Sequence, residues 1–241
     1  MNFVIRKDQA SYMAALKAWL KETKEDTPEE MSAFFSARLD IYEEHMSAWA
    51  EGYRKLAALL PGETRTILDL GPGTGLELDE IFLRFPDAEV TGIDLCKDML
   101  DRLSRKHPDK KLTLRHENYC LADFADGSDV PGSGFDVVVS FESLHHLLPE
   151  DKSGLYRRVF RALKPGGVFL NGDYIACCEE EENLLREAFL KKRSSSESRL
   201  LHLDIPLTLS HELCLLKEAG FEAEPVCCEN GATILRAYKR G

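Results

Sequence analysis

A glycine-rich turn directly after a short apolar run is the feature that most limits what this chain can fold into. The run Thr66 to Leu70 has the length and character of a buried strand, and residues 71–75, GPGTG, follow it. Alternating glycines let the backbone pass close to a ligand, because no Cβ stands in the way. In doubly wound sheets, ligands bind where a strand ends and turns into a helix. The sequence therefore predicts an α/β fold with a ligand site at this turn.

Short apolar runs alternate with helical stretches from Gly62 onward, as expected for βαβ units around a parallel sheet. A charged helix is predicted over Glu179 to Lys192, followed by a serine-rich connection over Arg193 to Glu197. The last two runs flank an Asn-Gly turn, so they should be antiparallel neighbours. The seven predicted strands are Thr66–Leu70, Glu89–Ile93, Lys111–Arg115, Phe135–Ser140, Val168–Asn171, Glu222–Cys227 and Ala232–Lys239.

Residues 1–61 have helical periodicity and no strand pattern. A helix start is predicted at Thr27, which would cap, with Pro28 in the first turn and Glu30 completing a capping box. A further helix is predicted from about Glu44 to Leu60, ending at Pro61-Gly62. We therefore divide the chain into an N-terminal helical cap, residues 1–61, and a ligand-binding domain, residues 62–241.

The composition narrows the class of partner. The chain has 42 acidic and 31 basic residues and a net charge of -11, which repels a phosphate backbone and disfavours nucleic acid. The first ten residues carry three charges and no long apolar run, so we expect no signal peptide, no membrane span and a cytoplasmic location.

The cysteines do not predict a disulfide framework. There are seven, an odd number, and the adjacent pairs Cys177-Cys178 and Cys227-Cys228 lack the spacing of zinc sites. Reduced thiols that pack as small residues are expected. Thiol chemistry or soft-metal binding is the alternative if the fold brings the two pairs together.

The residues around the turn favour a nucleoside with a cationic group over a dinucleotide. A dinucleotide fingerprint needs a glycine three residues after Gly73, where this chain has Leu76. Asp69 at the strand end suits a cation better than a pyrophosphate. Asp94 follows the next predicted strand, 23 residues after Gly71, which is the usual spacing for a carboxylate that holds a ribose. The alternative is an ordinary tight turn, with Asp94 capping the next helix.

With these residues in this order, the chain resembles the class I S-adenosylmethionine-dependent methyltransferases from about Ile67 to Tyr238. Their glycine motif resembles DLGPGTG here, and later motifs resemble the run from Phe135 to Leu147 and the LKPGG turn at residues 163–167. The resemblance implies a Rossmann-like sheet of order 3-2-1-4-5-7-6 with strand 7 antiparallel. It also implies S-adenosylmethionine as the cofactor.

The resemblance implies roles for individual residues as well. The loop around Gly71 and Gly73 would pack against the cofactor, Asp69 would lie near its amino-acid part, and Asp94 would bind its ribose. Asn118 is the candidate beside the adenine, with a plain turn residue as the alternative. Tyr42 would cover the cofactor, with helix packing as the alternative. The full predicted cofactor set is Tyr42, Asp69, Gly71, Gly73, Gly75, Asp94, Leu95, Asn118, Tyr119 and Phe141.

Candidate catalytic residues follow the fourth predicted strand, where the methyl group should emerge. Either His145 or His146 would accept a proton near neutral pH, and Glu142 would orient the histidine or hold a cationic substrate. We favour His145; the alternative is that one histidine is buried and fixes the loop. No metal is predicted, because the two histidines are consecutive and no pair has helical ligand spacing beside a carboxylate motif.

The leading hypothesis is methyl transfer from S-adenosylmethionine to a small-molecule acceptor, because an acidic chain with a helical cap suits an enclosed pocket. A noncatalytic module that binds a nucleoside or S-adenosylmethionine is the alternative from another class. An NAD-dependent oxidoreductase is the third hypothesis. A homodimer is left open.

Overall fold

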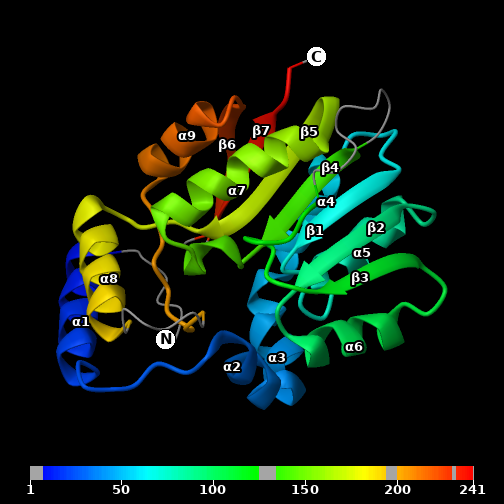
Figure 1. Cartoon of the computed structure of the whole chain (residues 1–241). Helices are drawn as coiled ribbons and strands as arrows, with labels where there is room; N and C mark the ends of the chain where they lie inside the picture. The colour runs from blue at the N-terminus through cyan, green and yellow to red at the C-terminus, as the bar shows by residue number, and fades with distance from the viewer. Residues whose placement is uncertain (1–7, 125–133, 194–199, 230–231, 241) are drawn as a thin grey trace.

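The computed structural model describes residues 8–124, 134–193, 200–229 and 232–240 (Figure 1). In this part of the chain, a seven-stranded sheet has the order β3-β2-β1-β4-β5-β7-β6. β7 is antiparallel to β5 and β6, and the other neighbouring strands are parallel. The predicted fold class and strand order are confirmed. The strands are β1 Thr66–Leu70, β2 Glu89–Asp94, β3 Lys111–His116, β4 Phe135–Phe141, β5 Leu163–Tyr174, β6 Glu222–Glu229 and β7 Ala232–Tyr238.

Helices cover both faces of this sheet (Figure 1). Leu68 of β1 faces the core shared with α7 (Pro149–Ala162) and α9 (Leu209–Glu218). Ile67 faces the opposite core, shared with α4, α5 and α6. β1 is buried on both faces, as expected for the centre of a parallel sheet. The two cores therefore hold the carboxyl end of β1 in place, together with the glycine turn that follows it.

The N-terminal helices do not pack together as one bundle. α1 lies against α8, where Leu16 and Leu185 share a small apolar cluster (Figure 1). α2 contacts α6, and α4 packs on α5. The division at residue 61 stays a prediction. The helices are α1 Gln9–Glu22, α2 Met31–Ala37, α3 Leu39–Met46, α4 Ala50–Leu59, α5 Leu76–Arg84, α6 Lys97–Lys106 and α8 Glu179–Lys192.

Two helix boundaries differ from the prediction. The predicted helix start at Thr27 is wrong, because α2 begins at Met31. The carboxylate of Glu30 caps α2 by accepting hydrogen bonds from the backbone N–H groups of Ser32 and Ala33. The predicted helix from Glu44 is split, because a 3₁₀ turn separates α3 from α4. The Asn-Gly turn and most of the serine-rich connection lie outside the described residues. No helix in the described ranges is long and apolar enough to cross a membrane.

Candidate active site

The glycine turn after β1 has a backbone that only glycine adopts without strain. Gly71 and Gly73 have φ angles of 78° and 53°. A Cβ on Gly71 would lie 2.1 Å from Oγ of Ser143, and a Cβ on Gly73 would lie 3.1 Å from the hydroxyl of Tyr42. The turn therefore leaves open space at the carboxyl edge of the sheet that a side chain would fill.

Asp94 at the end of β2 is fixed by the same turn. Its Oδ2 accepts a hydrogen bond from the backbone N–H of Gly73 at 3.0 Å, and its Oδ1 accepts from that of Cys96 at 2.8 Å. Burial raises the pKa of Asp94 above its ordinary value, although these backbone donors oppose the rise. The N-cap of α6 is Cys96, so Asp94 is not the residue that caps that helix.

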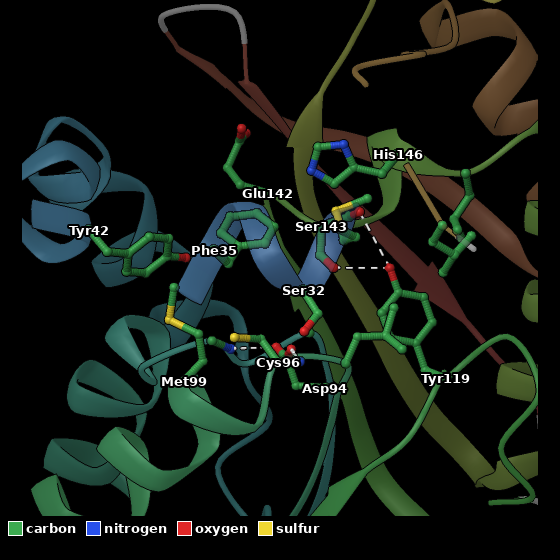
Figure 2. Close-up of a pocket in the computed structure, with 16 residues that line it drawn as sticks. Ser32, Phe35, Tyr42, Asp94, Cys96, Met99, Tyr119, Glu142, Ser143 and His146 are labelled. Carbon is green, nitrogen blue, oxygen red and sulfur yellow. Dashed lines mark hydrogen bonds between the residues drawn. The ribbon is translucent and has the colours of Figure 1, made fainter. Parts of the chain in front are cut away.

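These elements surround a pocket that is partly open to solvent. Figure 2 shows Asp94 at one side of the pocket and Glu142 and His146 at the opposite side, with Phe35 between them. The lining residues are Met31, Ser32, Phe35, Tyr42, Gly71, Gly73, Asp94, Leu95, Cys96, Met99, Tyr119, Glu142, Ser143, His146, Leu147 and Leu200.

Six of the ten predicted cofactor residues line this pocket: Tyr42, Gly71, Gly73, Asp94, Leu95 and Tyr119. Tyr119 is fixed by its hydroxyl, which lies 3.1 Å from Oγ of Ser143 (Figure 2). The structure thus brings together residues from α3, the glycine turn, the end of β2 and the segment after β3.

The other four predicted cofactor residues lie outside the lining. Asp69 is fully buried in β1, and Phe141 packs against Tyr53 with ring centroids 4.6 Å apart. At Gly75, a Cβ would lie 2.4 Å from a methyl carbon of Leu103, so this glycine permits close packing. Oδ1 of Asn118 accepts from the backbone N–H of Cys120 at 2.8 Å, which is the geometry of a turn residue. Their predicted contacts with the cofactor stay predictions.

The two candidate histidines have different surroundings. Nδ1 of His145 lies 2.7 Å from Oδ1 of the fully buried Asp173, and Nε2 lies 3.6 Å from Oδ1 of Asp204. Burial alone would lower the pKa of His145, but the Asp173 carboxylate outweighs it and raises the pKa to about 9. His146 lines the pocket, and its pKa is lowered to about 3 by burial and by the charge of His145. At neutral pH the pocket therefore meets a neutral imidazole, with a charged one behind it.

His145, His146 and Asp204 also offer one ligand atom each, all within 4.8 Å of one another. Asp204 comes from a segment that the sequence could not place beside the histidines. The absence of a metal therefore stays a prediction.

Glu142 has a strained backbone, because its φ angle of 49° is one that residues other than glycine rarely adopt. Its N–H donates to the carbonyl of Gly172 at 2.7 Å, which holds the end of β4 against β5. Strain of this kind concentrates at functional sites. Glu142 therefore has both a pocket position and a backbone outlier to support the prediction that it has a role.

Sequence reasoning missed the part of the pocket that α2 and the segment before α9 contribute. Met31 and Phe35 carried no local motif, and neither did Leu200 or Asp204. The N–H of Met31 donates to the carbonyl of Leu200 at 2.8 Å, so these two segments meet only in the folded chain. Cys96 and Ser143 could have been found, since each directly follows a residue that was predicted.

Comparison with known proteins agrees with this geometry. Residues 67–167 match a family described as a methyltransferase domain. This region carries the resemblance to the class I S-adenosylmethionine-dependent methyltransferases, and the match confirms that resemblance. Among solved structures, this chain is similar to an O-methyltransferase family protein of Burkholderia thailandensis, with a TM-score of 0.66, 15% identity and coverage of 96% of this chain and 70% of that one. The chain is also similar to human N-acetylserotonin methyltransferase, solved in complex with S-adenosylmethionine, with a TM-score of 0.62 and 18% identity. This match covers 88% of this chain and 59% of that one. At these identities the structures show the fold.

Curated relatives of this chain carry the names of different acceptors. Sterol 24-C-methyltransferase erg6 of Aspergillus fumigatus is 29% identical over 90% of this chain and 64% of its own length. Phosphoethanolamine N-methyltransferase of Plasmodium falciparum is 28% identical over 50% of this chain and 42% of its own. The chain thus spans less than two thirds of the length of either relative.

The residues around this pocket fit S-adenosylmethionine. The glycine turn leaves the space that a closely bound ligand needs, and Asp94 faces the pocket with lone pairs for a ribose. Neither carboxyl oxygen of Asp69 has a hydrogen-bond partner among the described residues, which is costly for a buried group. Burial and the nearby Glu77 carboxyl raise the pKa of Asp69 well above its ordinary value. A cationic group beside Asp69 would offset both costs.

Proposed function

We propose that this protein transfers the methyl group of S-adenosylmethionine to a small-molecule acceptor. The observation that carries the proposal is one pocket with the glycine turn and Asp94 on one side and Glu142 and His146 on the other. The bound cofactor supplies a methyl group that is already electrophilic. The protein then needs to align an acceptor with that methyl group and to exclude water.

The residues on the cofactor side of the pocket bind the cofactor and cover it. Asp94 accepts hydrogen bonds from the ribose, and its position depends on the same N–H of Gly73 that shapes the turn. Phe35 and Tyr42 stand beside each other with ring centroids 6.1 Å apart and cover the pocket from the N-terminal helices. Residues 1–61 then act as a cap and residues 62–241 as the cofactor-binding domain.

On the acceptor side, His146 rather than His145 meets the acceptor. As a neutral imidazole it accepts a hydrogen bond from a hydroxyl or amine and so orients the attacking atom. It is a weak base, because the charged His145 beside it opposes a second positive charge. Asp173 and His145 support it from behind.

The acceptor is a neutral or cationic molecule. Among the described residues, the pocket lining includes two carboxylates, Asp94 and Glu142, and no lysine or arginine. A phosphate or carboxylate on the acceptor would be desolvated there without a cationic partner, which is costly. This disfavours an acceptor like that named for the Plasmodium relative, and it favours hydroxyl- or amine-bearing apolar compounds.

Release of S-adenosylhomocysteine, measured over a panel of alcohols, phenols, amines and their phosphorylated counterparts, tests the proposal. We expect turnover with unphosphorylated members, and loss of that turnover in His146→Ala with cofactor affinity retained. His211→Ala is the matched control, because His211 pairs with Glu182 at 2.6 Å and does not line the pocket.

Cofactor binding without turnover on any member would favour the noncatalytic binding module. Wild-type turnover in His146→Ala would reject its acceptor role. We keep the homodimer as a separate hypothesis, which light scattering on the purified chain decides.

A further inference from the structure

Three sulfur atoms from distant segments meet between α1 and α8. Met13 lies on α1, and Cys177 and Cys178 directly precede α8. Sγ of Cys177 lies 3.8 Å from Sγ of Cys178, and each Sγ lies 3.9 Å from Sδ of Met13. Met13 is buried and both cysteines are half-buried, within an apolar cluster that includes Leu16 and Leu185. The sulfurs therefore form a nearly equilateral triangle that is partly accessible from outside.

The size of the triangle matches a trigonal metal site. The centre of a triangle with sides of 3.8 to 3.9 Å lies about 2.2 Å from each corner, close to the length of about 2.3 Å that a metal–thiolate bond takes. Two thiolates and a thioether are soft ligands, which select monovalent copper. Zinc prefers four ligands and does not ordinarily take a thioether. We infer that Met13, Cys177 and Cys178 form a binding site for Cu(I).

Acidic side chains begin the helix that follows the triangle. The first turn of α8 carries four consecutive glutamates, residues 179–182, and Oε2 of Glu181 accepts from the backbone N–H of Cys177 at 2.6 Å. Burial, followed by Glu181, raises the pKa of the Cys177 thiol to about 12, so this thiol is neutral in the metal-free protein. On binding, copper forms bonds to the three sulfurs, each thiol that becomes a thiolate releases its proton to solvent, and the metal stays Cu(I).

The site would cross-link the N-terminal helix to the body of the protein. Met13 and Cys177 are 164 positions apart, and the contact joins α1 to the segment that leads from β5 into α8. None of the three residues lines the cofactor pocket. Copper binding is therefore independent of the proposed methyl transfer, and it should raise the melting temperature without competing with the cofactor.

Anaerobic titration of the reduced full-length chain with Cu(I), in competition with the chromogenic chelator bathocuproine disulfonate, tests this site. We expect one tightly bound equivalent. Removing a mere partner of a metal ligand costs about 10- to 100-fold in affinity, so Cys177→Ser and Cys178→Ser should each lose about 100-fold or more. Met13→Leu, which keeps the apolar volume, should lose about 10-fold. Cys214→Ser is the matched control, because Cys214 is exposed on α9.

X-ray absorption of the copper-loaded wild type gives a second measurement that does not depend on how the variants fold. Three sulfur scatterers at about 2.3 Å are expected. Binding that is unchanged in both serine variants, or a copper with only two sulfur neighbours that Met13→Leu leaves unchanged, would overturn the site.

Discussion

Replacing Asp94 should weaken cofactor binding more than it weakens the fold. Its carboxylate faces the pocket while it accepts two backbone hydrogen bonds, from Gly73 and Cys96. Because burial raises its pKa, the ionised carboxylate lowers the stability of the cofactor-free protein at neutral pH. That cost is present above the ordinary aspartate pKa and disappears as the pH falls below it. Asp94→Asn removes the charge and keeps the size, but its amide offers one acceptor oxygen where the carboxylate offers two, so one of the two backbone N–H groups loses its partner.

The expected loss of affinity follows from the bonds that the carboxylate can offer. A hydrogen bond to a charged group contributes about 1.5 to 3 kcal/mol. Asp94→Asn keeps one carbonyl oxygen and loses one charged bond, so affinity should fall by about 10- to 100-fold. Asp94→Ala loses both ribose contacts and also frees the N–H of Gly73, so a loss of about 100-fold or more is expected.

Calorimetry with S-adenosylmethionine and S-adenosylhomocysteine measures the affinities, and thermal melting without ligand measures the fold. Asp101→Asn is the control, because Asp101 lies on α6 outside the pocket lining and forms an i,i+4 ion pair with Lys97. For Asp94→Asn we expect a lower affinity together with a melting temperature close to that of wild type, because removing the buried charge offsets the loss of one backbone hydrogen bond. A folded Asp94→Asn protein that binds both ligands as tightly as wild type would refute the ribose assignment.

Three further predictions concern the loop and the buried ion pairs. Gly73→Ala should reduce cofactor affinity with little loss of secondary structure, because φ is 53° there and the new Cβ would crowd a tyrosine hydroxyl at 3.1 Å; calorimetry and circular dichroism check this. Asp173→Asn should lower the free energy of unfolding by about 3 to 5 kcal/mol, because it leaves the buried His145 without its charged partner. The raised pKa of His145, about 9, contributes stability that is fully present below the ordinary histidine pKa and is lost as the pH rises through 9. The melting temperatures of wild type and Asp173→Asn should therefore converge above pH 9. Lys152→Met should cost a similar amount because Lys152 and Glu212 are both fully buried, and the added change Glu212→Leu should recover much of it, as urea unfolding can show.

The sheet could be predicted from the sequence because its signals are local. β1 is a short apolar run that ends in glycine, and its bounds, Thr66 and Leu70, are those predicted. α8 also has the predicted bounds, since its charged pattern begins and ends sharply. The antiparallel end of the sheet follows from an Asn-Gly turn, a strong short-range hairpin signal.

Half of the pocket could be predicted for the same reason. Gly73 and Asp94 end neighbouring parallel strands, and parallel strands bring their carboxyl ends to one edge of the sheet. The choice between two consecutive histidines could not be made this way. The sequence favours His145. In the structure, however, the His145 ring bonds to Asp173 at the end of β5, and His146 lines the pocket instead. A contact between residues 28 positions apart decides that difference, and no local pattern reports it.

The other half of the pocket depends on a pairing between two remote segments. Glu29 and Met31 exchange backbone hydrogen bonds with His202 and Leu200, and the His202 ring stacks on Phe34 with centroids 3.4 Å apart. All of these residues lie outside the family match at 67–167, which includes the glycine turn, Asp94 and His146. The matched region therefore holds pocket residues from both sides, including Asp94 and His146. Met31, Phe35 and Leu200 also line the pocket, but they come from segments that the match does not reach. The two curated relatives carry the names of acceptors as different as a sterol and phosphoethanolamine. Acceptor choice in this chain should accordingly respond to changes in residues 29–35 and 200–204, while cofactor affinity responds to changes in the glycine turn and Asp94.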